Sequence, residues 1–168
     1  MAPLLVAAAL CLICLPIEAA LLPFLGLSTA RADLALCAVL WLAVAQDGVV
    51  EGAVGAYVCG TVADLLYAVH PGLFALLALL LYTLVRVFAG ALDVRGPWGF
   101  SALCGLGALL QSGLARLLFS VSGQTWPAGA LPGILGGAAL TAACGAPVWM
   151  ALSWSTRALT REDPSLLR

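Results

Sequence analysis

The chain is poor in charge and contains no lysine. Of its 168 residues only 9% are charged, all seven basic residues are arginine, and 64% are hydrophobic. The mean hydropathy is +1.12, whereas a soluble domain carries roughly 25% charged residues. So few charges do not cover the surface of a water-soluble fold, and lipid is therefore expected to surround most of this chain.

Other shortages exclude whole classes of function. The arginines form no basic patch of the kind that binds nucleic acid. His70 is the only histidine and lies in a His-Pro-Gly turn, so it offers neither a metal cluster nor a base for a nucleophile. Asp47 and Asp64 are about 25 Å apart along one predicted helix and do not form a carboxylate dyad. We expect no enzyme, no metal site, no cofactor and no small-molecule substrate.

Cysteine is the one reactive residue type that is present in number. All six cysteines lie inside apolar runs, which is typical of small buried side chains rather than of a disulfide framework. They are Cys11, Cys14, Cys37, Cys59, Cys104 and Cys144.

Long apolar runs dominate the chain and predict an all-α, polytopic membrane bundle of six transmembrane helices. At about 20 residues per span, the runs fill one membrane domain, 1–168, and leave no separate soluble domain. The predicted spans are 3–25, 29–46, 48–69, 72–92, 98–121 and 131–154. The second is the weakest, because its apolar run from Leu34 to Ala45 covers about 18 Å of a core of about 30 Å.

The distribution of arginine predicts the orientation of these spans. Six spans place five arginines on one side and Arg31 on the other, with Arg116 inside a span. Because positive charge is enriched in cytoplasmic loops, both termini are expected in the cytoplasm of a bacterial inner membrane. The five are Arg86, Arg95, Arg157, Arg161 and Arg168.

Small residues recur every four positions in two of the predicted spans. In the third span Gly48, Gly52, Ala56 and Gly60 lead to Asp64. Such stripes let helix backbones approach closely in a membrane, and the drift of the helix keeps Gly48 off the face that Ala56, Tyr57 and Gly60 share with Asp64. The second stripe, in the sixth span, consists of Gly129, Gly133, Gly137, Thr141 and Gly145.

Three ionisable side chains fall toward the outer ends of predicted spans: Glu18, Asp64 and Arg116. Each costs roughly 2.5–3.5 kcal/mol to insert, and pairing between helices lowers that cost. We therefore hypothesise a contact between Asp64 and Arg116, with Glu18 as the competing partner. The alternative is that each side chain extends to its nearest interface.

The middle of the chain, roughly residues 28–90, resembles the rod shape-determining protein MreD family. The resemblance rests on three segments in order: Arg31-Ala32-Asp33-Leu34, the glycine-rich helix ending in Asp64-Leu65-Leu66, and Pro71-Gly72-Leu73-Phe74 leading to Tyr82. Ala32 stands where the family typically has proline, and Thr61-Val62-Ala63 stands where it is richer in leucine.

The resemblance implies a non-enzymatic inner-membrane scaffold of the cell-shape and peptidoglycan elongation complex. Its partners would be membrane lipids, a bitopic MreC-like protein and other elongation-complex membrane proteins. The candidate structural or partner residues are Arg31, Asp33, Gly52, Gly60, Asp64, Arg116 and Glu18.

The family is similar in fold to the substrate-binding subunits of energy-coupling-factor transporters, which supplies an alternative function. A vitamin-binding subunit needs an outward-facing pocket lined by aromatic and polar groups. Gln124, Trp126, Arg31 and Asp33 would contribute to it.

The six-span topology predicts that Asp47 and Gly123 lie on opposite sides of the membrane. Reporter domains fused at the two positions should therefore give opposite compartment signals, with Asp47 cytoplasmic. Equal signals from both fusions would contradict the six-span topology.

Overall fold

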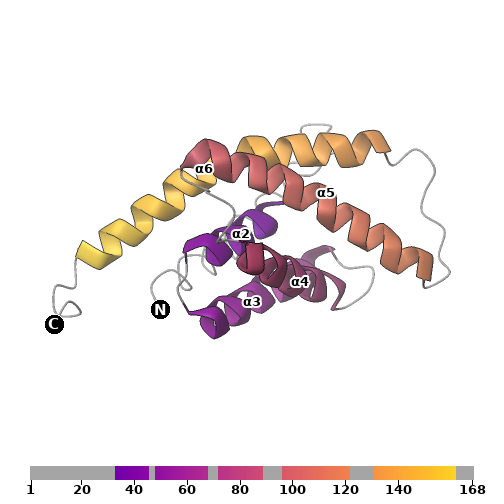
Figure 1. Ribbon diagram of the computed structural model, residues 1–168, viewed down its shortest axis with the longest axis horizontal. Coiled ribbons are helices and arrows are strands. Elements are labelled where there is room, and N and C mark those ends of the chain that lie inside the picture. Colours follow the sequence, from indigo (N-terminus) through magenta and orange to yellow (C-terminus); the bar gives the residue numbers. More distant parts are fainter. Residues whose placement is uncertain (1–32, 46–47, 68–71, 89–95, 122–130, 162–168) are drawn as a thin grey trace.

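The described residues form five helices and no strand. In this computed structural model they are residues 33–45, 48–67, 72–88, 96–121 and 131–161 (Figure 1). The helices are α2 (Leu34–Ala45), α3 (Val49–Tyr67), α4 (Leu73–Phe88), α5 (Pro97–Val121) and α6 (Leu131–Arg161). The described part of the chain is all-α, as the sequence predicts, and the predicted span 3–25 lies outside it.

Three of the described helices are long and apolar enough to cross a membrane. The candidate stretches are Val49–Leu66, Pro97–Leu118 and Leu131–Ala158, which confirms the membrane-helix character expected for α3, α5 and α6. At 1.5 Å per residue, α2 with 12 residues and α4 with 16 are about 18 and 24 Å long. Six spanning helices are therefore not confirmed.

The helix ends also differ from the predicted ones. The predicted span 29–46 is observed as a helix that begins only at Leu34, because Asp33 caps its first turn. At the other end of the chain, α6 continues past the predicted end at 154 to Arg161. Its C-terminal part therefore extends seven residues beyond the predicted sixth span.

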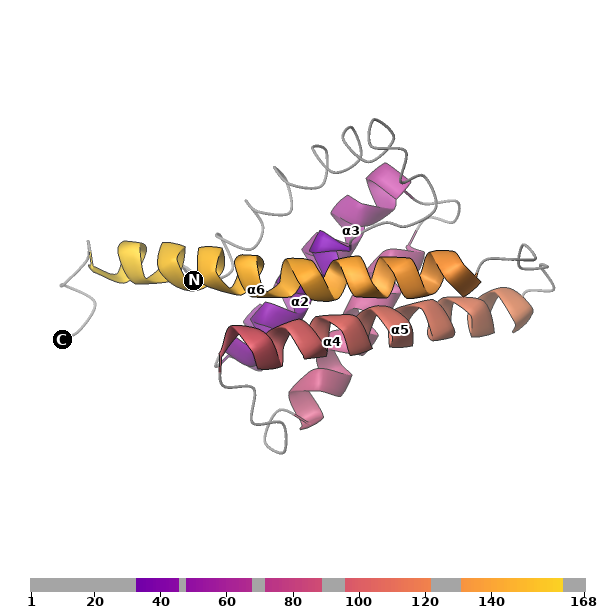
Figure 2. The ribbon, with the colours of Figure 1, turned by 90° about the horizontal axis from the view of Figure 1, so that it is seen from above.

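Helices α5 and α6 lie side by side (Figure 2). A Cβ atom added at Gly145 would lie 2.8 Å from Cα of Ser101, and one added at Gly105 would lie 3.1 Å from Cβ of Ala142. The Ser101 hydroxyl donates to the Ala142 carbonyl across the same contact. The absence of side chains at these glycines lets the two backbones approach, as predicted for the stripe of the sixth span.

Helices α3 and α4 form the second close pair. A Cβ atom at Gly60 would lie 2.6 Å from Cα of Ala75, and one at Gly52 would lie 2.7 Å from Cζ of Tyr82. Ala56 lies between the two glycines and is fully buried. The stripe of the third span is therefore a packing surface, whereas Tyr57, predicted on the same face, is 51% exposed.

The short helix α2 lies at the centre of the described bundle. It contacts each of the other four described helices, and all nine residues from Ala35 to Ala43 are buried. A helix that is apolar all round is suited to burial on every side. At Gly107 of α5 an added Cβ would lie 2.9 Å from Leu40, and Arg86 of α4 donates to the Ala43 carbonyl near the end of α2.

The contact at Gly60 should be intolerant of a methyl group. Because the nearest atom to an added Cβ is backbone, Gly60→Ala should force α3 and α4 apart and lower the free energy of unfolding by about 1–3 kcal/mol. The measurement is unfolding of the purified protein in mixed micelles by titration with a denaturing detergent.

Gly113→Ala provides the matched control for this prediction. Gly113 lies in α5, and nothing lies within 4 Å of a Cβ added there, so the same change should alter stability by less than about 0.5 kcal/mol. Equal losses in the two variants would contradict the α3–α4 contact.

Candidate functional site

The N-terminus of α2 is held by the side chain and backbone of Asp33. The Leu36 N–H donates to Asp33 Oδ1 at 2.9 Å, which is the usual cap of a helix N-terminus. The Asp33 N–H donates to Thr141 Oγ1 of α6 at 3.0 Å. The capping residue of α2 is therefore also its attachment to α6.

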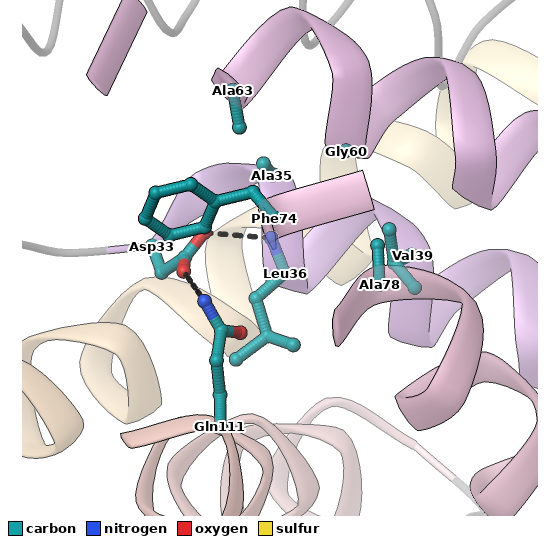
Figure 3. A pocket seen from close by; sticks show the side chains of 9 residues that line it. All are labelled: Asp33, Ala35, Leu36, Val39, Gly60, Ala63, Phe74, Ala78 and Gln111. Carbon is teal, nitrogen blue, oxygen red and sulfur yellow. Dashed lines mark hydrogen bonds between the residues drawn. The ribbon is translucent and has the colours of Figure 1, made fainter. Parts of the chain in front are cut away.

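The second carboxylate oxygen of Asp33 reaches a third helix. Gln111 Nε2 of α5 donates to Asp33 Oδ2 at 2.6 Å (Figure 3). Thr141 Oγ1 donates its own proton to the Gly137 carbonyl at 2.8 Å, which leaves its lone pairs to accept from the Asp33 N–H. We call Asp33, Gln111 and Thr141 the Asp33 node; it joins α2, α5 and α6.

The Asp33 node lies within the helix bundle, not at an end of it. Gln111 and Thr141 fall inside the apolar stretches Pro97–Leu118 and Leu131–Ala158, and Thr141 is 1% exposed. Non-helical backbone at membrane depth is tolerated only where protein or a water-filled cavity surrounds it. The hydrogen bonds of Asp33 place it against α5 and α6, away from their ends.

A small cavity adjoins the Asp33 node between α2, α3, α4 and α5. Its polar lining is Asp33 and Gln111, and the remaining lining is apolar, including Phe74 and Ala78 (Figure 3). The cavity volume is about 10 Å³, enough for roughly one water molecule. Pockets for drug-sized ligands measure roughly 300–1,000 Å³, so this cavity is far smaller than such a pocket.

Asp64 performs a second capping role, between α3 and α4. The Phe74 N–H donates to Oδ1 at 2.9 Å and the Ala75 N–H donates to Oδ2 at 3.0 Å. These amides belong to the first turn of α4, where no carbonyl of the same helix accepts from them, and the negative charge suits the positive end of the helix dipole. Both oxygens of Asp64 therefore accept hydrogen bonds from backbone amides, and the hypothesised contact with Arg116 stays a prediction.

The remaining predicted residues do not converge on one site. Gly52 and Gly60 lie in the α3–α4 contact, and Arg116 lies half-buried on α5. Glu18 and Arg31 lie outside the described residues, as do Gln124 and Trp126 of the outer pocket expected for the alternative function. Sequence reasoning brought out Asp33 and Asp64 as candidates but did not connect either to its observed partners.

Two members of the Asp33 node were missed as functional residues. Thr141 was assigned to a packing stripe, and Gln111 was not singled out at all. The available signal was polarity, since a glutamine within the apolar run of α5 needs a hydrogen-bond partner in lipid.

The described cysteines are small buried or half-buried side chains. Cys37, Cys59 and Cys104 are buried, and Cys144 is half-buried. Among the described residues, no group of three histidine, cysteine, aspartate or glutamate side chains is arranged to hold a metal ion.

No family model, no curated protein and no solved structure matches this chain. The resemblance to the MreD family therefore stays a prediction from the residues of segment 28–90.

The hydrogen bond between Asp33 and Gln111 predicts coupled losses of stability. Asp33→Ala removes the α2 cap and leaves the Gln111 amide unsatisfied, which together should cost about 2–4 kcal/mol. In a Gln111→Leu background the same change should cost about 1 kcal/mol less, because no amide is left unpaired. Unfolding in mixed micelles of the wild type, both single variants and the double variant measures this coupling, and strict additivity would contradict the contact.

Proposed function

We propose that this chain is a non-enzymatic membrane scaffold that acts through contacts between helices. The observation that supports the proposal is the hydrogen bonding of two carboxylates, those of Asp33 and Asp64. Asp33 and Asp64 both accept hydrogen bonds from backbone amides at helix N-termini. Their negative charges therefore stabilise helix ends within the bundle. The cavity that Asp33 lines holds roughly one water molecule.

The outward faces of the span-length helices are consistent with this role. α3 exposes Val54 and Leu65, α5 exposes Leu106 and Leu117, and α6 exposes Leu135. Large apolar side chains on the outside of membrane helices contact either lipid or the helices of other proteins. A bundle with these faces has the surface that a scaffold for bitopic proteins requires.

The finer proposal is a role in the bacterial cell-elongation complex. It rests on the order and spacing of the MreD-like segments in residues 28–90. On this proposal the chain lies in the inner membrane with both termini in the cytoplasm. It binds a bitopic MreC-like partner through helix–helix contacts and helps to connect the cytoplasmic filament to peptidoglycan synthesis.

Site-specific photo-crosslinking tests the scaffold proposal. A crosslinking amino acid is introduced at outward positions of the three span-length helices, Val54, Leu106 and Leu135. Each variant is coexpressed with the MreC-like protein of the same genome. At least one outward position should give a crosslinked heterodimer.

Inward positions on the same helices serve as matched controls. Ala56, Leu103 and Val148 are buried within the bundle, so they should crosslink only within the chain. Absence of the heterodimer from all outward positions in a folded protein would overturn the proposal. Copurification of a vitamin with an energy-coupling ATPase complex would favour the transporter subunit instead.

A further inference from the structure

We propose that the thiols of Cys37 and Cys104 form a binding site for a soft metal ion that takes two ligands. Cys37 lies in α2 and Cys104 lies in α5, and both side chains are fully buried. The ion would bind inside the bundle, between two helices. The proposal therefore goes beyond the scaffold function and does not depend on it.

Both sulfur atoms lie against the same turn of α6. The Cys37 thiol donates to the Thr141 carbonyl at 3.8 Å. A Cβ atom added at Gly145 would lie 3.3 Å from Cys104 Sγ, and Gly145 follows Thr141 by about one helical turn. The missing side chain of Gly145 therefore leaves the space that the Cys104 sulfur occupies.

The two thiols also contact each other. A hydrogen bond joins the side chains of Cys37 and Cys104, so two sulfur ligands from different helices lie together in the apolar core. The usual role of a buried cysteine is packing, because its thiol behaves as a small apolar group. Packing accounts for the burial of each thiol, as it does for Cys59 of α3, but it does not require two thiols to meet.

The number of ligands selects the coordination geometry of the ion. Structural zinc sites use four ligands, and the described residues bring no third histidine, cysteine or carboxylate ligand to the two thiols. Thiolates are soft ligands, and two of them in line are the preferred coordination of the soft ions Hg(II), Cu(I) and Ag(I). The pair of Cys37 and Cys104 therefore suits a two-coordinate ion.

The apolar surroundings select a divalent ion over a monovalent one. Two thiolates around a monovalent ion leave a net negative charge, which is costly in an apolar core, and the Asp33 carboxylate lies about one turn before Cys37. Two thiolates around Hg(II) form a neutral complex. When mercuric chloride binds, two S–H bonds and two Hg–Cl bonds break, two Hg–S bonds form, and two molecules of HCl leave without any change of oxidation state.

Mercury binding to the full-length chain tests the site. Cys11 and Cys14 lie outside the described residues and are both changed to serine, so that their thiols do not compete for the ion. This reference protein is purified in detergent micelles and loaded with one equivalent of mercuric chloride in a chloride buffer. X-ray absorption by the bound mercury should show two sulfur ligands, whereas an ion held by a single thiol keeps one chloride.

Substitution of single cysteines then identifies the ligands. Cys37→Ser and Cys104→Ser should each weaken the retention of mercury against 2-mercaptoethanol by at least about a hundredfold, because the second Hg–S bond forms within the same molecule. Cys59→Ser is the matched control. Cys59 is buried as deeply as the pair but lies in α3, so its loss should leave the retention of mercury unchanged.

Either of two results would overturn the proposal. The first is one sulfur and one chloride ligand on the mercury of the reference protein, a measurement that needs no substitution within the described helices. The second is retention of mercury by a folded Cys37→Ser or Cys104→Ser variant as tight as that of Cys59→Ser. Folding of each variant is checked by its unfolding in mixed micelles.

Discussion

The burial of α2 from Ala35 to Ala43 is the constraint on which the rest of the described structure depends. This helix contacts the other four described helices and is only 12 residues long. Its N-terminus therefore lies inside the bundle and not in water. The amides of that first turn need acceptors where the surroundings supply no solvent. Asp33 Oδ1 accepts from the Leu36 amide, and Thr141 accepts from the Asp33 amide. Asp33 Oδ2 accepts from Gln111, so the Asp33 node also joins α2 to α5 and α6.

The same physical solution recurs at Asp64, between the other two helices. There the carboxylate accepts from two amides of the α4 N-terminus, and the close approach at Gly60 lies one turn before it on α3. In both places a charged residue stabilises a helix end, and small residues allow the neighbouring backbone to come near. The charges that appear costly in a hydropathy profile are therefore part of how the helices are held together.

Because both carboxylates stabilise helix ends, the function that we propose is binding to the helices of other membrane proteins and not catalysis. Asp64 accepts two hydrogen bonds from main-chain amides, and Asp33 accepts one from a main-chain amide and one from Gln111. The outward faces, by contrast, are apolar along three span-length helices.

The sequence by itself determined the helical class and the membrane character of α3, α5 and α6, because both follow from long apolar runs. It also determined the packing faces of α3 and α6, because small residues at four-residue intervals lie near one another on a helix. Only the tertiary structure decided that α2, the weakest predicted span, occupies the centre. A uniformly apolar helix has no pattern that tells a lipid-facing side from a protein-facing one. The partners of Asp33 and Asp64 were likewise beyond the sequence, since Gln111 and Thr141 lie far along the chain and reach Asp33 only after α5 and α6 have packed around α2.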